Sequence, residues 1–324
     1  MGTSVRSPLI PDRLIANMPA AALIAIDWGT TSARAYYLDA SGQVVAMRAL
    51  PLGVLQVQDG CFPEALATLL GDWQSVAAPR LACGMIGSRQ GWREAPYVEC
   101  PAPLAALAAG IVIVPGDALA IVPGVRTRDA NGIPDVLRGE ETQLAGAIGE
   151  QEDRVLAVLP GTHCKWALVE RGRIVDFATY MTGEMYNVLL QHSILGRLAQ
   201  PADPKPGSAF TRGVTRGLGA GGLSHDLFGA RTLALMGELA SHDVADWLSG
   251  LLIGREVRSA RVWAQRQGCD GARVRLVGAD ALLARYAAAL TQAGIAVELA
   301  PVDAAARGLW QIAQHASLAP SKLH

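Results

Sequence analysis

The sequence has almost no net charge, few cysteines and no long uninterrupted apolar segment. It contains 28 basic and 29 acidic residues, and its formal net charge at pH 7 is -1. Nucleic acids and anionic membranes attract proteins through an excess of basic residues, and this balance gives no such attraction. We therefore expect a small molecule as the ligand, and neither nucleic acid nor a membrane as a partner.

The few cysteines do not form a recognisable framework. There are five in 324 residues, an odd number, and no two of them are spaced as C-x-x-C. A zinc site or a disulfide scaffold is therefore not expected, and a reducing compartment such as the cytoplasm is the natural location. The five are Cys61, Cys83, Cys100, Cys164 and Cys269.

Two uncharged segments resemble targeting or membrane signals but fall short of them. The segment 14–26 follows two arginines, yet cleavage near Ala21 or Ala22 as an export signal would cut into the approach to the first predicted strand. The segment 100–116 holds three prolines and is shorter than the ~20 apolar residues of a spanning helix. We predict a disordered or appended tail over residues 1–20 and no transmembrane segment.

The apolar content indicates a folded protein with a large core. Hydrophobic residues make up 51% of the chain and charged residues 18%. A chain of 324 residues is long enough for about two domains. The pattern of predicted elements alternates between strands and helices, which indicates an α/β fold.

The N-terminal part begins with three predicted strands in an antiparallel meander. LIAI ends at Asp27, ARAYYLDA follows a Gly-Thr-Thr turn, and QVVAMRAL follows the tight turn Ser41-Gly42. A helix over 63–76 and a strand over 80–87 come next. The proline-rich segment 95–103 is expected to be irregular, and two strands follow in GIVIVPG and LAIVPGV.

The C-terminal part repeats the pattern of the opening. A helix is predicted over 139–149, and RVLAVLPGTHCKWALVERGRIVDF then gives strand, Gly-Thr turn, strand, tight turn and strand. Two copies of one hairpin pattern predict two similarly built domains. The middle of the chain, 189–264, has a helical period. The segment 273–299 is a strand–helix–strand unit, and a final helix begins at Asp303.

The first Gly-Thr turn has the residues of a metal–phosphate site. Gly29 allows close approach of a ligand, and Thr30 and Thr31 supply hydroxyl and N–H donors for phosphate oxygens. Asp27 would repel a bare phosphate but would suit a Mg²⁺ ion held through water. The alternative is an ordinary hairpin in which Asp27 caps the turn.

The second Gly-Thr turn offers more donors but lacks the acid. Gly161, Thr162 and His163 would face a phosphate, and Lys165 follows closely. Leu159 stands where the first turn has Asp27, so only the first turn is expected to bind the metal. His163 and Lys165 have the plainer interpretations of a loop histidine and a solvated strand residue.

A third glycine turn, VGAD at 277–280, lies between a strand and a helix. Such a turn suits the close approach of a nucleotide, and the residues concerned are Gly278, Ala279 and Asp280. One glycine is weak evidence, because most strand–helix turns need one.

Together these motifs resemble the sugar kinases of the actin–hexokinase–heat-shock ATPase superfamily. IDWGTTSAR is similar to the first phosphate motif, LPGTHCKW to the second, and LVGAD to the adenosine motif. Longer strings resemble the 2-dehydro-3-deoxygalactonokinase family more closely, over nearly all of 22–316. They are MIGSRQGWREAPYVECPA, RGEETQL, LPGTHCKW, MTGE and WLSGLLIG.

The resemblance implies two ribonuclease-H-like lobes with mixed sheets and a nucleotide cleft between them. The N-terminal lobe would span 21–138 and the C-terminal lobe 139–324. It also implies an ATP- and Mg²⁺-dependent kinase that phosphorylates the 6-hydroxyl of 2-dehydro-3-deoxy-D-galactonate in galactonate catabolism. A homo-oligomer is compatible with the sequence.

The catalytic base is expected at the start of the helix GEETQLAGAIG. Related kinases have an aspartate there, and alignment by the glycines places Thr142 at its position. The neighbouring Glu141 is the preferred candidate, followed by Glu140. Both acids also favour the positive end of the helix dipole by ~0.3–1 kcal/mol, which explains them without chemistry.

Two arginines are candidates for the substrate carboxylate, because a guanidinium matches a carboxylate in two hydrogen bonds. They are Arg89, in GMIGSRQGW, and Arg138. Ser88 and Gln90 suit sugar hydroxyls, and Trp92 suits an apolar sugar face. Either arginine could instead be a surface residue.

Other functions of the same fold stay open at this point. One is a kinase for another sugar acid, such as 2-dehydro-3-deoxygluconate. Another is an actin-like ATPase, which would polymerise with nucleotide, or a phosphatase, which would release phosphate without a sugar acceptor.

Overall fold

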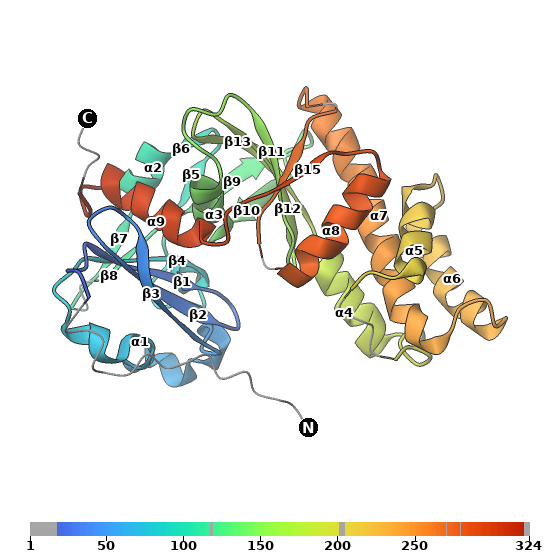
Figure 1. The fold of residues 1–324 in the computed structure, drawn as a ribbon, viewed down its shortest axis with the longest axis horizontal. Helices are drawn as coiled ribbons and strands as arrows, with labels where there is room; N and C mark the ends of the chain where they lie inside the picture. Colours follow the sequence, from blue (N-terminus) through green and yellow to red (C-terminus); the bar gives the residue numbers. More distant parts are fainter. Residues whose placement is uncertain (1–17, 117–118, 201–204, 270, 279, 321–324) are drawn as a thin grey trace. The chain divides into compact units, whose positions relative to one another are not determined.

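The computed structural model describes residues 18–116, 119–200, 205–269, 271–278 and 280–320. Figure 1 shows the order of the helices and strands along the chain. Contacts between Cα atoms divide the chain into two units. Unit 1 holds residues 1–151, 171–174 and 303–324, and unit 2 holds 152–170 and 175–302.

Unit 1 is built on a mixed sheet of the order β3-β2-β1-β4-β8-β7. The first three strands are the predicted antiparallel meander, and β4 and β8 continue the sheet in parallel. The bounds are β1 (Leu23–Trp28), β2 (Ala33–Leu38), β3 (Val44–Leu50), β4 (Arg80–Gly84), β7 (Val112–Val114) and β8 (Leu119–Ile121).

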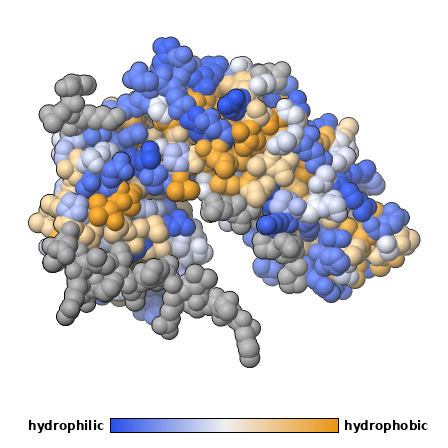
Figure 2. Space-filling view, viewed as in Figure 1, coloured by the Kyte–Doolittle hydropathy of each residue, from blue (hydrophilic) through white to orange (hydrophobic). Residues whose placement is uncertain are grey.

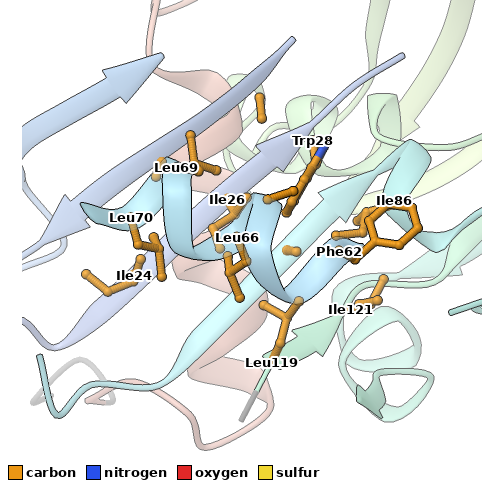
Figure 3. Packing of buried hydrophobic residues seen from close by; sticks show 14 of the residues in the cluster. Ile24, Ile26, Trp28, Phe62, Leu66, Leu69, Leu70, Ile86, Leu119 and Ile121 are labelled. Carbon is orange, nitrogen blue, oxygen red and sulfur yellow. The ribbon is translucent and has the colours of Figure 1, made fainter. Parts of the chain in front are cut away.

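One face of this sheet is covered by α1 (Phe62–Leu70). Its apolar side chains recur at helical spacing and pack on alternate residues of β1 and on β8, as Figure 3 shows. A fully buried Leu or Ile contributes roughly 1.5–3 kcal/mol to folding, so this cluster is the main core of unit 1. The helix was expected to reach residue 76. It ends at Leu70 because Gly71 has a φ of +55°, and a 3-10 turn, Gly71–Ser75, follows.

The other helices of unit 1 are α2 (Leu104–Ala109), α3 (Glu140–Ala147) and α9 (Ala304–His315). Helices α3 and α9 approach each other so closely that only glycine fits at two points. A Cβ on Gly308 would lie 1.8 Å from the Thr142 carbonyl oxygen, and one on Gly146 would lie 1.9 Å from the Ala304 carbonyl oxygen. Gly146 of GEETQLAGAIG and Gly308 of AAARG therefore allow the two helix backbones to pack in direct contact, and this contact positions the start of α3.

Unit 1 also contains short strands that the sequence did not indicate. The segment 95–103, expected to be irregular, contains β5 (Tyr97–Glu99) and β6 (Ala102–Pro103). Strand β5 pairs with β9 (Gly124–Arg128), and β9 pairs with β10 (Pro134–Leu137). Strand β10 leads directly into the start of α3.

Unit 2 repeats the sheet of unit 1. Its strands follow the order β15-β14-β11-β12-β13, with β11 antiparallel to β12 and parallel to β14. The corresponding order in unit 1 is β8-β4-β1-β2-β3. The bounds are β11 (Val155–Leu159), β12 (Cys164–Glu170), β13 (Arg173–Tyr180), β14 (Val274–Leu276) and β15 (Val297–Leu299). The predicted repeat and the α/β fold of two similar lobes with mixed sheets are confirmed.

Helices make up the rest of unit 2: α4 (Thr182–His192), α5 (Ser208–Leu218), α6 (Leu223–Leu235), α7 (Val244–Arg266) and α8 (Asp280–Gln292). Glycines on α5 and α7 let the two backbones approach closely. Helix α6 leaves Phe228 and Leu235 exposed, and Met236 follows it. Apolar surface lies over this part of the chain in Figure 2.

The division into units differs in three places from the boundary after residue 138 that the sequence suggested. Residues 139–151, 171–174 and 303–324 group with unit 1, and the first and last of these segments carry α3 and α9. Their helices α3 and α9 pack on each other, and α9 also contacts β1 and β4. No helix among the described residues is both long enough and apolar enough to cross a membrane.

Candidate functional site

The first Gly-Thr turn lies between β1 and β2 and carries an acid at its entrance. All residues of β1 are buried except Asp27, which is partly exposed near the end of the strand. The Gly29 N–H donates to the Ser32 carbonyl at 2.9 Å and closes the turn. Thr30 and Thr31 are exposed. The turn therefore presents two hydroxyls to solvent beside a carboxylate.

A glycine from another part of unit 1 supports this turn. The N–H groups of Val54 and Leu55 donate to the carbonyls of Gly29 and Thr30, at 3.0 and 3.2 Å. A Cβ on Gly53 would lie 2.2 Å from the Thr30 carbonyl oxygen, so only glycine allows this approach. Sequence analysis missed Gly53, because its role depends on a contact between segments separated in the chain.

The start of α3 lies against the strand beside Asp27. Gly139 has a φ of +108°, and a Cβ there would lie 3.1 Å from the Cα of Gly84. Gly84 ends β4, which pairs with β1, and its own Cβ would lie 3.6 Å from Oδ1 of Asp27. This packing brings the acids at the start of α3 close to Asp27.

Burial and the charge of Glu140 raise the pKa values of two acids of this cluster. Burial raises the pKa of Asp27, the Arg34 guanidinium at 3.6 Å opposes the shift, and the charge of Glu140 adds to it. Burial raises the pKa of Glu141 to about 7, and Glu140 contributes again. A cluster of this kind favours a bound cation or proton, as a catalytic site does.

The two glutamates have different surroundings. Glu141 is only 1% exposed, and its carboxylate accepts hydrogen bonds from the Gly139 N–H at 2.6 Å and the Thr142 hydroxyl at 2.9 Å. Glu140 is half-buried, and its Oε2 accepts the Arg138 N–H at 2.9 Å. Of the two, Glu140 is the carboxylate that a ligand can reach.

Thr142, which occupies the position of the family's aspartate, is fully buried. Its hydroxyl bonds to Glu141, and Cys83 of β4 also contacts it. Thr142 therefore supports the start of α3 from behind, and the departure from the wider pattern leaves Glu140 as the acid that faces solvent.

Most of the residues predicted to bind the substrate follow β4, whereas Arg138 follows β10, and their surroundings separate them into two groups. Ser88 and Arg138 both border Gly87, because a Cβ on Gly87 would lie 2.9 Å from Nη1 of Arg138. The Ser88 hydroxyl and this Nη1 are buried and have no hydrogen-bond partner among the described residues. The Arg138 guanidinium also stacks on Tyr97 at 4.2 Å and donates to the Ala95 carbonyl at 2.9 Å.

The second group is more exposed. Arg89 is 87% exposed and forms an ion pair with Glu94 at 3.1 Å, and Gln90 is exposed. Trp92 is half-buried and stacks on Phe62, with ring centroids 5.9 Å apart. Of the two arginines, Arg138 is therefore the one with a buried guanidinium nitrogen that has no hydrogen-bond partner among the described residues.

The second Gly-Thr turn lies between β11 and β12 in unit 2, and α4 supports it. A Cβ on Gly183 would lie 2.4 Å from the Gly161 carbonyl oxygen, and the Glu184 N–H donates to the Thr162 carbonyl at 2.9 Å. The Glu184 carboxylate also bonds to the imidazole of His163. The string MTGE, noted only as a similarity, thus forms the support of this turn.

Lys165 points into unit 2 rather than into solvent. It is 6% exposed, and its Nζ donates to the Thr179 hydroxyl at 2.8 Å. Thr162 and His163 are exposed. The turn therefore offers its backbone, Thr162 and His163 directly, with the positive charge of Lys165 behind them.

The third glycine turn borders the second one. Gly278 has a φ of +146°, and its ideal Cβ would lie 3.7 Å from the carbonyl oxygen of Pro160, which precedes Gly161. Ala279 lies outside the described residues. Asp280 is the first residue of α8, and the structure describes its place in the chain but not its side chain.

A magnesium ion would fit the acids of unit 1. Among the described residues no three His, Cys, Asp or Glu side chains form a ready metal site. Mg²⁺ needs fewer protein ligands, because it keeps several waters and shares phosphate oxygens with its substrate. Asp27, with Glu140 near it, meets that requirement.

The chain is similar to characterised proteins over most of its length. The model of the family "2-keto-3-deoxy-galactonokinase" matches residues 27–312. The 2-dehydro-3-deoxygalactonokinase of Escherichia coli (strain K12) is 38% identical over 283 residues, covering 87% of this chain and 94% of that protein. A candidate for the same kinase from Rhizobium meliloti (strain 1021) is 36% identical over 306 residues, covering 89% and 97%.

A solved structure has the same fold. It comes from Sinorhizobium meliloti and is described as a candidate 2-dehydro-3-deoxygalactonokinase. It superimposes with a TM-score of 0.81 at 35% identity, covering 90% of this chain and 98% of that one.

Proposed function

The chain belongs to the 2-keto-3-deoxy-galactonokinase family, and we propose that it phosphorylates the 6-hydroxyl of 2-dehydro-3-deoxy-D-galactonate with ATP in galactonate breakdown. The observation that supports this most directly is the pair Asp27 and Glu140 beside the exposed Gly-Thr turn of unit 1. Such a reaction uses cytoplasmic ATP, so we place the protein in the cytoplasm.

We assign the role of general base to Glu140 rather than to Glu141, which reverses the order expected from the sequence. A base must come within hydrogen-bond reach of the proton that it removes. Glu141 is buried, with both the Gly139 N–H and the Thr142 hydroxyl bonded to its carboxylate. In our proposal Glu141 orients the start of α3, and Glu140 contacts the substrate.

The transfer needs few steps from the protein. The 6-hydroxyl oxygen forms a bond to the γ-phosphorus, the bond from that phosphorus to the β,γ-bridging oxygen breaks, and the hydroxyl proton passes to Glu140. Asp27 would hold Mg²⁺ through water. When bound, the ion neutralises charge on the phosphate oxygens.

Each unit has its own candidate contacts for the nucleotide. We propose that Gly29, Thr30 and Thr31 of unit 1 bind phosphate oxygens. We propose the same for Gly161, Thr162 and His163 of unit 2, with Lys165 adding positive charge. Gly278, Ala279 and Asp280 would border the adenosine. The parallel construction of the two turns supports this assignment.

For the sugar acid, the unpaired Nη1 of Arg138 and the hydroxyl of Ser88 are the favoured partners of the carboxylate or a neighbouring hydroxyl. A buried donor without a partner carries a free-energy penalty that a ligand can relieve. Arg89, Gln90 and Trp92 would form the more exposed rim of this site.

A coupled kinase assay tests the proposal. The purified chain is supplied with ATP, Mg²⁺ and either 2-dehydro-3-deoxy-D-galactonate or its gluconate epimer, and the phosphorylated carbon is identified by NMR. We expect ADP formation only with an acceptor, phosphate on the 6-oxygen and faster turnover of the galactonate compound. Preference for the gluconate epimer would mean that the gluconate compound is the substrate. Steady ADP release without an acceptor would contradict the assignment of kinase activity.

A further inference from the structure

Unit 2 contains a buried carboxylate for which the proposed reaction gives no role. Glu256 lies in α7 and is 3% exposed. The indole Nε1–H of Trp166 donates to its Oε1 at 2.8 Å, and the hydroxyl of Tyr286 donates to its Oε2 at 2.8 Å. The Thr182 hydroxyl and the Cys164 thiol also bond to it.

The donors around Glu256 require a hydrogen-bond acceptor at this position. Burial raises the pKa of Glu256, and the four hydrogen bonds oppose that shift. Trp166 is fully buried and its indole can only donate, so it needs an acceptor at this position. The carboxylate is inaccessible to a ligand, so it acts through the groups that it binds.

The four donors come from three elements that carry, border or support the predicted nucleotide contacts of unit 2. Cys164 and Trp166 belong to β12, directly after the turn 161–163. Thr182 is the first residue of α4, whose Gly183 and Glu184 support that turn. Tyr286 lies in α8, the helix that follows the turn at Gly278.

We propose that Glu256 is a positioning residue for the nucleotide, because its carboxylate holds the strand after the second Gly-Thr turn, the start of α4 and the middle of α8 in one relative geometry. This inference depends on the proposed kinase function. Removal of the carboxylate would leave the Trp166 N–H without an acceptor and let the three elements shift independently. A shift of about 1 Å in groups that orient a substrate can reduce a rate about a hundredfold.

The test uses the full chain and a matched control. Glu256→Ala is compared with Asp226→Ala. Asp226 is also a buried acid of unit 2, but it is paired with Arg216 and Arg255 and with none of the four donors that bond to Glu256. Mg²⁺–ATP binding is measured by calorimetry, KM is measured separately for ATP and for the sugar acid, and thermal unfolding reports stability.

We expect Glu256→Ala to weaken ATP binding about tenfold or more while the KM for the sugar acid stays near that of the wild type. Asp226→Ala should lower the unfolding temperature and leave ATP affinity unchanged. Glu256→Gln should restore most of the affinity, because its amide oxygen accepts from Trp166 and its amide N–H₂ donates to the Tyr286 oxygen.

A second variant decides the matter if Glu256→Ala does not fold. Thr182→Val removes one donor on the α4 side, and it should weaken ATP binding in the same direction by about threefold. Unchanged ATP affinity in a folded Glu256→Ala or in Thr182→Val, or an equal loss in Asp226→Ala, would overturn the inference while the kinase stands. A wild-type chain that binds no ATP would overturn both.

Discussion

The two Gly-Thr turns share a backbone construction but differ in the side chains around them. Each follows an apolar strand, and each is supported by a glycine, Gly53 or Gly183, whose Cβ would lie 2.2 or 2.4 Å from a carbonyl oxygen of the turn. The turn of unit 1 lies beside Asp27 and the acids of α3. The turn of unit 2 has Leu159 at the equivalent strand position and Lys165 behind it.

This difference shows how a repeated fold supports a reaction that is not symmetric. The backbone of either turn can donate to phosphate oxygens. The acids near the first turn add the capacity to hold a cation and accept a proton, and the basic side chains near the second add only positive charge and position. We therefore expect changes of the acids near the first turn to reduce kcat, and changes of the basic side chains near the second turn to weaken ATP binding.

The largest effect is expected for Asp27→Asn. Loss of the charge that holds Mg²⁺ should lower kcat by about a thousandfold, the upper range for removal of one electrostatic group. Asp39→Asn is the control, because Asp39 is an acid of the exposed turn between β2 and β3. Near-normal turnover of Asp27→Asn at saturating Mg²⁺ would contradict the proposal that Asp27 holds the metal.

Glu140→Gln should follow, with kcat about a hundredfold lower and ATP affinity almost unchanged, as expected for loss of a general base. Glu64→Gln is the matched control, since Glu64 is an exposed acid in the first turn of α1. Steady-state kinetics and ATP binding are measured for both. If Glu141→Gln is the variant with the greater loss of kcat, the assignment returns to Glu141.

Lys165→Met should affect binding more than chemistry. Loss of a charged donor costs ~1.5–3 kcal/mol, so the Kd for ATP should rise about thirtyfold with a smaller change in kcat. Lys205→Met makes the same charge change outside the turn. A drop in kcat with unchanged ATP affinity would mean that Lys165 acts on the chemical step rather than on ATP binding.

Substitution of the supporting glycines tests whether the backbones of both turns contribute equally to ATP binding. Gly53→Ala and Gly183→Ala both place a Cβ within 2.4 Å of a carbonyl oxygen and should weaken ATP binding by about tenfold through displacement of the turns. Gly222→Ala should have no effect, because an ideal Cβ there has no atom within 4 Å. If only one of the two supported turns responds, the phosphates do not contact both.

The smallest effect on turnover, and a distinct effect on stability, is expected for Glu141→Gln. The pKa of Glu141 is raised from 4.5 to about 7, so the folded state binds its proton more tightly than the unfolded state. Its contribution to stability is complete below pH 4.5 and is lost as the pH rises to 7, by about 3 kcal/mol.

Urea unfolding of the wild type and of Glu141→Gln between pH 4.5 and 8 measures this contribution. The free energy of unfolding of the wild type should fall relative to that of the variant up to pH 7 and then run parallel to it. A constant difference over the whole range would mean that folding does not raise the pKa of Glu141.

The sequence was sufficient to predict the features that depend on local pattern. The apolar strands, the two Gly-Thr turns and the helix 139–149 are each specified by neighbouring residues, and their repetition predicted the two similar sheets. Asp27 and the acids of α3 were likewise identified as candidates, because acids next to a glycine turn stand out.

The remaining features depend on contacts between distant segments. The side chains of Glu140 and Glu141 differ in exposure because the backbone of α3 packs closely on that of α9 at Gly146 and Gly308. The roles of Gly53 and Glu256 likewise arise only when their segments meet other elements. The short strands β5 and β6 contain prolines or border them, so local pattern argued against them.

The most direct measurement is a crystal structure of the chain with ADP, Mg²⁺ and the sugar acid. We predict that the diphosphate contacts Gly29–Thr31 and Gly161–His163, that the metal lies near Asp27, and that the 6-hydroxyl lies within hydrogen-bond reach of Glu140. A diphosphate bound away from Thr30 and Thr162 would contradict this prediction.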